Sequence, residues 1–167
     1  MTDDVDARLA AAGERLTDLS GSLIAGAPWG LAAQFDNSPE ASWGPRETLA
    51  HLEEMLAYWL GEMERVLEAP DDGAPFGRVI TDEVRLAIIE RDRTLPLREL
   101  LARVRMGIDR WRGRWAELDD ASGRRTGTHP RLGAVTVSDL ASRFAVGHLE
   151  EHLDQLAAAI RDRPTAD

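Results

Sequence analysis

Three histidines combine the residue type and the spacing best suited to chemistry in this 167-residue chain. His148 and His152 lie four residues apart, so in a helix both imidazoles project from the same side. Such a pair is a bidentate ligand set for a transition metal, and a third imidazole from a neighbouring helix would complete a three-histidine site. His51 lies in another predicted helix and can supply it. A site of this kind keeps open coordination positions, which is typical of a reactive metal rather than a structural one.

The spacing of His148 and His152 is a weak signal by itself. A zinc-protease helix would need a glutamate directly after the first histidine, and Leu149 occupies that position. The alternative interpretation is that both histidines lie on a helix surface beside acidic neighbours. Whether the pair indicates a metal site therefore depends on the organisation of the rest of the chain.

The composition narrows the chemistry. The chain has no cysteine and no lysine, and all 20 basic residues are arginine. The absence of cysteine excludes disulfides, thiolate ligands and a cysteine nucleophile, and the absence of lysine excludes Schiff-base chemistry and a phosphate-loop lysine. If the protein is an enzyme, a metal is the best remaining source of reactivity.

Charge and hydropathy limit the partners. The net charge is −10 and the sequence pI is about 4.9, whereas a nucleic-acid-binding domain presents a basic face. No apolar run is long enough to span a membrane, and the N-terminal segment Met1-Thr2-Asp3-Asp4 is acidic and does not resemble a signal peptide. We therefore expect a cytoplasmic protein that acts on a small molecule, with no nucleic-acid or membrane partner. A homodimer through an exposed helix pair stays open.

The elements that must position the histidines are helices. Four segments repeat apolar residues at mostly alternating intervals of four and three, the pattern of a buried helix face. These residues are Val5, Leu9, Ala12, Leu16, Leu19 and Leu23; Leu49, Leu52, Leu56, Trp59, Met63 and Val66; Leu97, Leu101, Val104, Ile108, Trp111, Trp115 and Leu118; and Leu149, Leu153, Leu156 and Ile160. The pattern predicts an all-α four-helix bundle, with one domain over residues 1–167.

Turn and cap residues set the limits of these helices. Gly44-Pro45 predicts the start of the second helix, Pro96 opens the third, and Thr136 is a cap for the last. Loops are expected at residues 26–39, 70–75 and 122–133, and a short amphipathic helix within 79–93. His51, His148 and His152 each precede a leucine of the buried face, so each flanks that face by about 100°. Such positions line the edge of a bundle, where a cleft can admit a metal and a substrate, although partly exposed histidines without a ligand role would give the same pattern.

Two motifs resemble those of the DinB/YfiT-like family. The first is Trp43-Gly-Pro-Arg-Glu-Thr-Leu-Ala-His51-Leu, at the start of the second helix. The second runs from Thr128-His-Pro-Arg-Leu-Gly133 through Thr136 to His148-x-x-Glu151-His152-x-x-Gln155. The order and spacing of the motifs cover nearly the whole chain. Gly44 departs from the Ser or Thr cap that is usual in the family, which concerns only the start of the helix.

The resemblance implies a four-helix bundle of up-down-down-up topology and a divalent metal on His51, His148 and His152. Zinc is the first expectation, and nickel, iron, manganese or cobalt also suit three imidazoles. The family is named after a DNA-damage-inducible gene, which associates it with stress responses without implying DNA binding. Some members transfer low-molecular-weight thiols, so the resemblance implies a metal-dependent thiol S-transferase that acts on an electrophilic small molecule. A metal-dependent hydrolase and a non-catalytic metal-binding or dimerising bundle are the alternatives.

Other polar residues are candidates for supporting roles. Glu54, Glu151 and Gln155 lie close to the histidines along their helices and could orient a ligand or a water molecule, and each is equally well explained as a solvated or capping residue. His129 could carry a proton from its loop, although a structural role is favoured. The arginines of residues 103–114 could bind an anionic thiol, but a solvated helix face explains them better. Trp111 and Trp115 are assigned to core packing.

Overall fold

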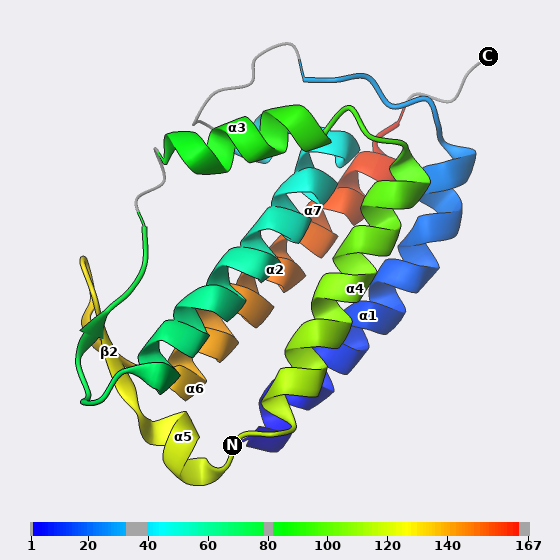
Figure 1. The fold of residues 1–167 in the computed structure, drawn as a ribbon. Coiled ribbons are helices and arrows are strands. Elements are labelled where there is room, and N and C mark those ends of the chain that lie inside the picture. Colours follow the sequence, from blue (N-terminus) through cyan, green and yellow to red (C-terminus); the bar gives the residue numbers. More distant parts are fainter. Residues whose placement is uncertain (1, 33–39, 79–81, 164–167) are drawn as a thin grey trace.

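The computed structural model describes residues 2–32, 40–78 and 82–163, and this part of the chain is mainly helical (Figure 1). The long helices are α1 (Thr2–Ala25), α2 (Pro45–Glu68), α4 (Leu97–Trp115), and a C-terminal stretch of α6 (Val137–Leu140), the π-helical η2 (Ala141–Gly147) and α7 (His148–Arg161). The short elements are the 3₁₀ turn η1 (Glu40–Ser42), α3 (Glu83–Asp92), α5 (Asp120–Arg124), and the strands β1 (Ala74–Pro75), β2 (Thr126–His129) and β3 (Gly133–Thr136). No helix within the described ranges is both long and apolar enough to cross a membrane.

The long helices form a four-helix bundle with up-down-down-up topology. In Figure 1, α1 runs upward, α2 and α4 both run downward, and the C-terminal stretch runs upward again. Because α2 and α4 are neighbours that run in the same direction, the chain must return between them to the end where α2 began, and β1 and α3 lie on that return. Both the predicted fold class and the predicted topology are confirmed.

The predicted apolar faces meet in the core. In α4 the buried residues are Leu100, Leu101, Val104, Ile108, Trp111 and Trp115. Trp111 also donates from Nε1 to the backbone oxygen of Leu56 at 2.8 Å, which joins α4 to α2 and satisfies the buried indole. The helix ends at Trp115, so Leu118 lies beyond it rather than within it as expected, although its side chain still packs partly against the core.

Helix starts follow the cap residues. α2 begins at Pro45 with Gly44 as its N-cap, and the Thr136 hydroxyl caps α6 by accepting from Asp139 N at 3.0 Å. The short helix expected within residues 79–93 is α3, whose cap Asp82 accepts from two backbone amides; residues 79–81 lie outside the described part. Residues 33–39 of the first predicted loop also lie outside it.

The expectation of a loop at residues 122–133 is wrong. This segment contains part of α5 and most of a β-hairpin, in which β2 pairs antiparallel with β3 and parallel with β1. Arg125 anchors the hairpin by donating to the backbone oxygens of Leu67 and Ala69 at 2.9 and 2.7 Å. These four-residue strands depend on bonds to distant parts of the chain, and their glycines and the adjacent proline resemble turn residues in the sequence.

A π-helical segment interrupts the last helix, which was expected to be a regular α-helix. Buried residues recur there every four positions, at Ala141, Ala145, Leu149 and Leu153. In a regular helix of 3.6 residues per turn, this spacing would drift by about 40° at each step. The wider turn of η2 reduces the drift and ends directly before His148, so it sets the direction in which the two histidines of α7 project.

Candidate metal centre and the cavity beside it

The bundle brings the three predicted histidines together. His51 projects from α2, and His148 and His152 project from α7. His148 Nε2 lies 3.1 Å from His51 Nε2 and 2.9 Å from His152 Nε2. His51 and His152 are buried, and His148 is partly exposed. Three ring nitrogens therefore converge on one point.

A carboxylate that sequence reasoning missed completes the cluster. Glu40 Oε2 lies 3.9 Å from His148 Nε2 and 3.7 Å from His152 Nε2. One ligand atom from each of these residues and from His51 fits within a span of 4.8 Å. Arg85 of α3 binds the other oxygen of Glu40 and so holds the carboxylate in place. Glu40 follows Pro39 in a segment that resembles a loop, and no spacing in the sequence connects it with the histidines.

Gln155 fixes the protonation of His152. The Gln155 amide nitrogen donates to the backbone oxygens of Glu40 and Trp43 at 2.9 and 3.2 Å. Its oxygen must therefore face His152 Nδ1, at 2.8 Å, and that nitrogen must carry the proton. His152 Nε2 consequently carries no proton, and its lone pair points at the cluster.

Glu54 lies behind His51. The buried Nδ1 of His51 has no hydrogen-bond partner in the described part of the chain, and Glu54 Oε2 is 3.9 Å away. Arg78 binds both oxygens of Glu54 and packs over the ring of Tyr58 at 3.8 Å. Glu54 is therefore a fixed negative charge near the outer nitrogen of His51, the place of a carboxylate that orients a metal-binding imidazole.

Glu151 does not join this arrangement. Its side chain is exposed, and among the described residues it makes no hydrogen bond or ion pair with an imidazole. It lines a shallow pocket with Glu40, His148, His152 and Gln155. Of the three supporting residues proposed from the sequence, Gln155 contacts a histidine, Glu54 lies near one, and Glu151 contacts none.

Burial keeps the three imidazoles neutral. It lowers the pKa of His51 well below 6.5, it lowers the pKa of His148 to about 3, and it lowers the pKa of His152 as well. The neutral imidazole is the form that binds a metal. Nitrogens bound to one ion at about 2.1 Å lie about 3.0 Å apart at right angles and about 3.4 Å apart at the tetrahedral angle. The observed separations are close to this range, and with the carboxylate they suit a divalent transition metal.

A cavity of about 500 Å³ opens beside the cluster. Its lining residues come from η1, α2, α3, the segment before α3, the hairpin, η2 and α7: Glu40, His51, Met55, Trp59, Arg78, Arg85, His129, Arg131, Phe144 and His148. Phe144 stacks on Trp59 on one side and on His129 on the other, with ring centroids 4.7 and 5.1 Å apart. His129 thus reaches the same cavity as the cluster without belonging to it, and the cavity has the size and mixed lining of a small-molecule site.

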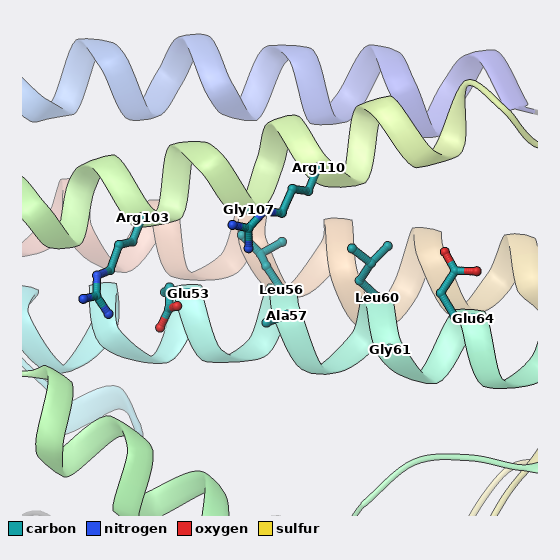
Figure 2. A pocket seen from close by; sticks show the side chains of 9 residues that line it. All are labelled: Glu53, Leu56, Ala57, Leu60, Gly61, Glu64, Arg103, Gly107 and Arg110. Carbon is teal, nitrogen blue, oxygen red and sulfur yellow. The ribbon is translucent and has the colours of Figure 1, made fainter.

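The tryptophans and arginines of α4 do not line the histidine cavity. Trp111 and Trp115 are buried in the core, as expected. Arg112 pairs with Asp6 and Arg114 with Glu64 on the bundle surface. A second hollow, of about 340 Å³, runs between α2 and α4, and Figure 2 shows leucine, alanine and glycine along its floor with glutamates and arginines at its margins. It contains no histidine.

Comparisons with known proteins agree with this architecture. The chain belongs to the DinB superfamily, whose family model matches residues 4–156. Its structure is similar to YfiT from Bacillus subtilis, with a TM-score of 0.71 and 17% sequence identity, over 96% of this chain and 86% of YfiT. YfiT is described as a probable metal-dependent hydrolase with an unusual four-helix bundle topology. No curated protein gives a significant sequence match.

Proposed function

We propose that this protein is a metal-dependent hydrolase of a small organic substrate, with one divalent metal held by His51, His148 and His152. The observation that carries the proposal is the convergence of three neutral imidazole nitrogens on one point, with the carboxylate of Glu40 facing them. YfiT, the structural neighbour, is described as a probable metal-dependent hydrolase, which agrees with this choice. Zinc is the first candidate, and nickel, iron, manganese and cobalt suit the same donors.

A divalent metal at this point would polarise a substrate carbonyl and lower the pKa of water. Glu40 is the group that can then move a proton. Its Oε2 faces the cluster while Arg85 holds the other oxygen, so Oε2 can take the proton of the attacking water. The new carbon–oxygen bond forms as the bond to the leaving group breaks, and Glu40 returns the proton to that group.

Thiol transfer, the activity that the family resemblance implied, is the second candidate. One observation favours it, because the chain has no cysteine and the cavity is large enough to admit a small thiol as a cosubstrate. We rank the hydrolase first because attack by water requires a base, and Glu40 is a carboxylate placed to act as one. A metal-bound thiolate is already deprotonated and would leave Glu40 without this role.

The experiment begins with protein purified without a nickel column. Elemental analysis should find about one divalent metal per chain in the wild type and none in His51→Ala or His148→Ala. Turnover of an activated ester, 4-nitrophenyl acetate, is then measured with and without added thiol. Glu40→Gln should retain the metal and lose about 100-fold in turnover, the usual contribution of a general base.

Three results would contradict parts of this proposal. A wild-type protein that holds no metal even after reconstitution removes the catalytic centre. Loss of metal in Glu40→Gln makes Glu40 a ligand rather than a base. Turnover that requires a thiol, across several esters and electrophiles, replaces the hydrolase with the transferase.

A further inference from the structure

The arginines that line the histidine cavity are paired with carboxylates except for one. Of the three arginines that line it, Arg78 binds Glu54 and Arg85 binds Glu40. Arg131, in the turn between β2 and β3, has no carboxylate partner among the described residues. The chain as a whole has a net charge of −10, so an uncompensated arginine at a cavity is a local exception that attracts anions.

The same turn supplies a second donor. The backbone amide of Arg131 donates to His129 Nδ1 at 3.3 Å. Because Nδ1 accepts, the neutral ring carries its proton on Nε2, and no described group accepts a hydrogen bond from that nitrogen. Burial, followed by the charges of Arg131 and Arg143, lowers the pKa of His129, which keeps it in this neutral donor form. His129 and Arg131 therefore place an N–H donor and a guanidinium at one side of the cavity.

Aromatic and apolar side chains also line the cavity. Trp59 and Phe144 are stacked with an interplanar angle of 28°, and Phe144 and His129 with one of 27°. Met55 adds a buried apolar side chain to the lining. The hydrocarbon body of a small molecule packs well against such a lining.

We propose that the β2–β3 turn binds the anionic group of the substrate through Arg131 and His129. The substrate is then a small organic anion with an apolar body, whose anionic end lies at the turn and whose reactive end lies at the histidine cluster. The position of the reactive end rests on the proposed function. Binding of the anion does not, since none of its contacts involves a metal.

The test uses metal-free protein and two probes of the same shape. Naphthalene-2-sulfonate carries a negative charge, and methyl 2-naphthyl sulfone is its neutral counterpart. Titration calorimetry should give a dissociation constant about tenfold lower for the sulfonate in the wild type, because a charge-assisted contact is stronger than a neutral one. Arg131→Gln should abolish this preference while the neutral sulfone binds as before, and Arg131→Lys, which keeps the charge, should restore part of it.

Arg110→Gln is the matched control. Arg110 is exposed and lines the groove between α2 and α4 rather than the cavity, so its removal should change the preference less than twofold. Equal binding of the two probes by the wild type, an unchanged preference in Arg131→Gln, or equal losses in both arginine variants would overturn the proposal. A protein that binds the sulfonate but holds no metal would contradict the proposed hydrolase and leave the anion site standing.

Discussion

The histidine cavity and the groove between α2 and α4 are both hollows in the same bundle, and they arise in different ways. The groove is lined from two helices only and exists because alanine and glycine occupy positions where larger side chains would fill it, namely Ala57, Gly61 and Gly107 (Figure 2). The cavity is lined from η1, α2, α3, the hairpin, η2 and α7, and its polar groups are fixed by hydrogen bonds and ion pairs. A hollow left by small residues reflects packing alone. A hollow in which many elements bring neutral imidazoles and carboxylates together indicates a functional site.

The largest expected difference between the two regions is in stabilisation by metal. A thousandfold excess of free zinc over its dissociation constant should raise the free energy of unfolding of the metal-free protein by about 4 kcal/mol, because the ion binds only the folded state. His152→Ala should lose nearly all of this gain. Leu60→Ala, in the groove, should lower the starting stability and keep the full gain. Urea unfolding at fixed free zinc measures both, and a full gain in His152→Ala would place the metal elsewhere.

A smaller effect on metal binding is expected at Gln155, which orients His152 in the cluster. In Gln155→Leu the acceptor of the proton on His152 Nδ1 is lost, and the backbone oxygens of Glu40 and Trp43 lose their bonds from the Gln155 amide. Metal affinity should fall by about 10- to 100-fold, as for other residues that orient a ligand. Competition with a chromophoric chelator measures the change. Glu151→Gln is the control, since Glu151 makes no hydrogen bond with an imidazole among the described residues and acts on His152 only through its charge. An equal loss in both variants would mean that the hydrogen bond between Gln155 and His152 does not set the affinity.

The sequence predicted the parts of this site that follow a helical period. Four-residue spacing placed His148 and His152 on one side of a helix, and the apolar pattern placed His51 on a neighbouring one. Glu40, Arg78 and Arg85 could not be found in this way. Glu40 and Arg78 lie outside the α-helices, and Arg85 lies on a ten-residue helix with little periodicity. Their positions depend on tertiary contacts, Arg85 with Glu40 and Arg78 with Glu54, for which no local pattern exists.

The fold, like the site, could be predicted only where the sequence has a helical period. Apolar periodicity was enough to predict four long helices, since burial of one face determines each of them. The π-helical turn at Ala141–Gly147 was missed because a period of four fits both a drifting α-helix and a π turn, and only packing against the bundle distinguishes them. The hairpin was missed because its strands are held by Arg125 and by pairing with β1, both distant in the sequence.

As the pH falls, the titration of His148 in the cluster should lower the free energy of unfolding, and the titration of Glu53 in the groove should raise it. Burial lowers the pKa of His148 to about 3 from 6.5, so below pH 6.5 the unfolded chain binds more protons than the folded one. Stability of the metal-free protein should therefore fall as the pH drops from 6.5 towards 3, by on the order of 1 kcal/mol for this histidine at pH 5. His148→Gln should flatten that part of the curve. Urea unfolding at pH 7.5 and 5 gives the slope, and an unchanged slope in the variant would show that His148 is not buried in its neutral form.

In the groove, burial and the charge of Asp92 raise the pKa of Glu53 above 4.5. Here the folded state holds its proton more tightly, so the stability linked to this group is present at low pH and is lost as the pH rises through the raised pKa. Glu53→Gln should therefore stabilise the protein at pH 7.5 and have little effect near pH 4. A stabilisation that is equal at both pH values would remove the titration of Glu53 as its cause.

The smallest effect tests whether the groove is only a product of packing. In α4, a methyl group added at Gly113 would meet no atom within 4 Å, so Gly113→Ala should gain about 0.5–1 kcal/mol from helix propensity alone. At Gly107 the same methyl would lie 3.0 Å from Leu56 Cδ1 and 3.3 Å from its Cβ, so the Leu56 side chain must shift to admit it. Gly107→Ala should therefore gain less than Gly113→Ala or lose stability, with metal binding at the histidines unchanged. Urea unfolding of both variants under one condition measures the difference. Equal gains would mean that the Leu56 side chain shifts at no cost in stability, so that the floor of the groove could change shape to fit a ligand. The short distance from the added methyl group to Leu56 predicts the opposite.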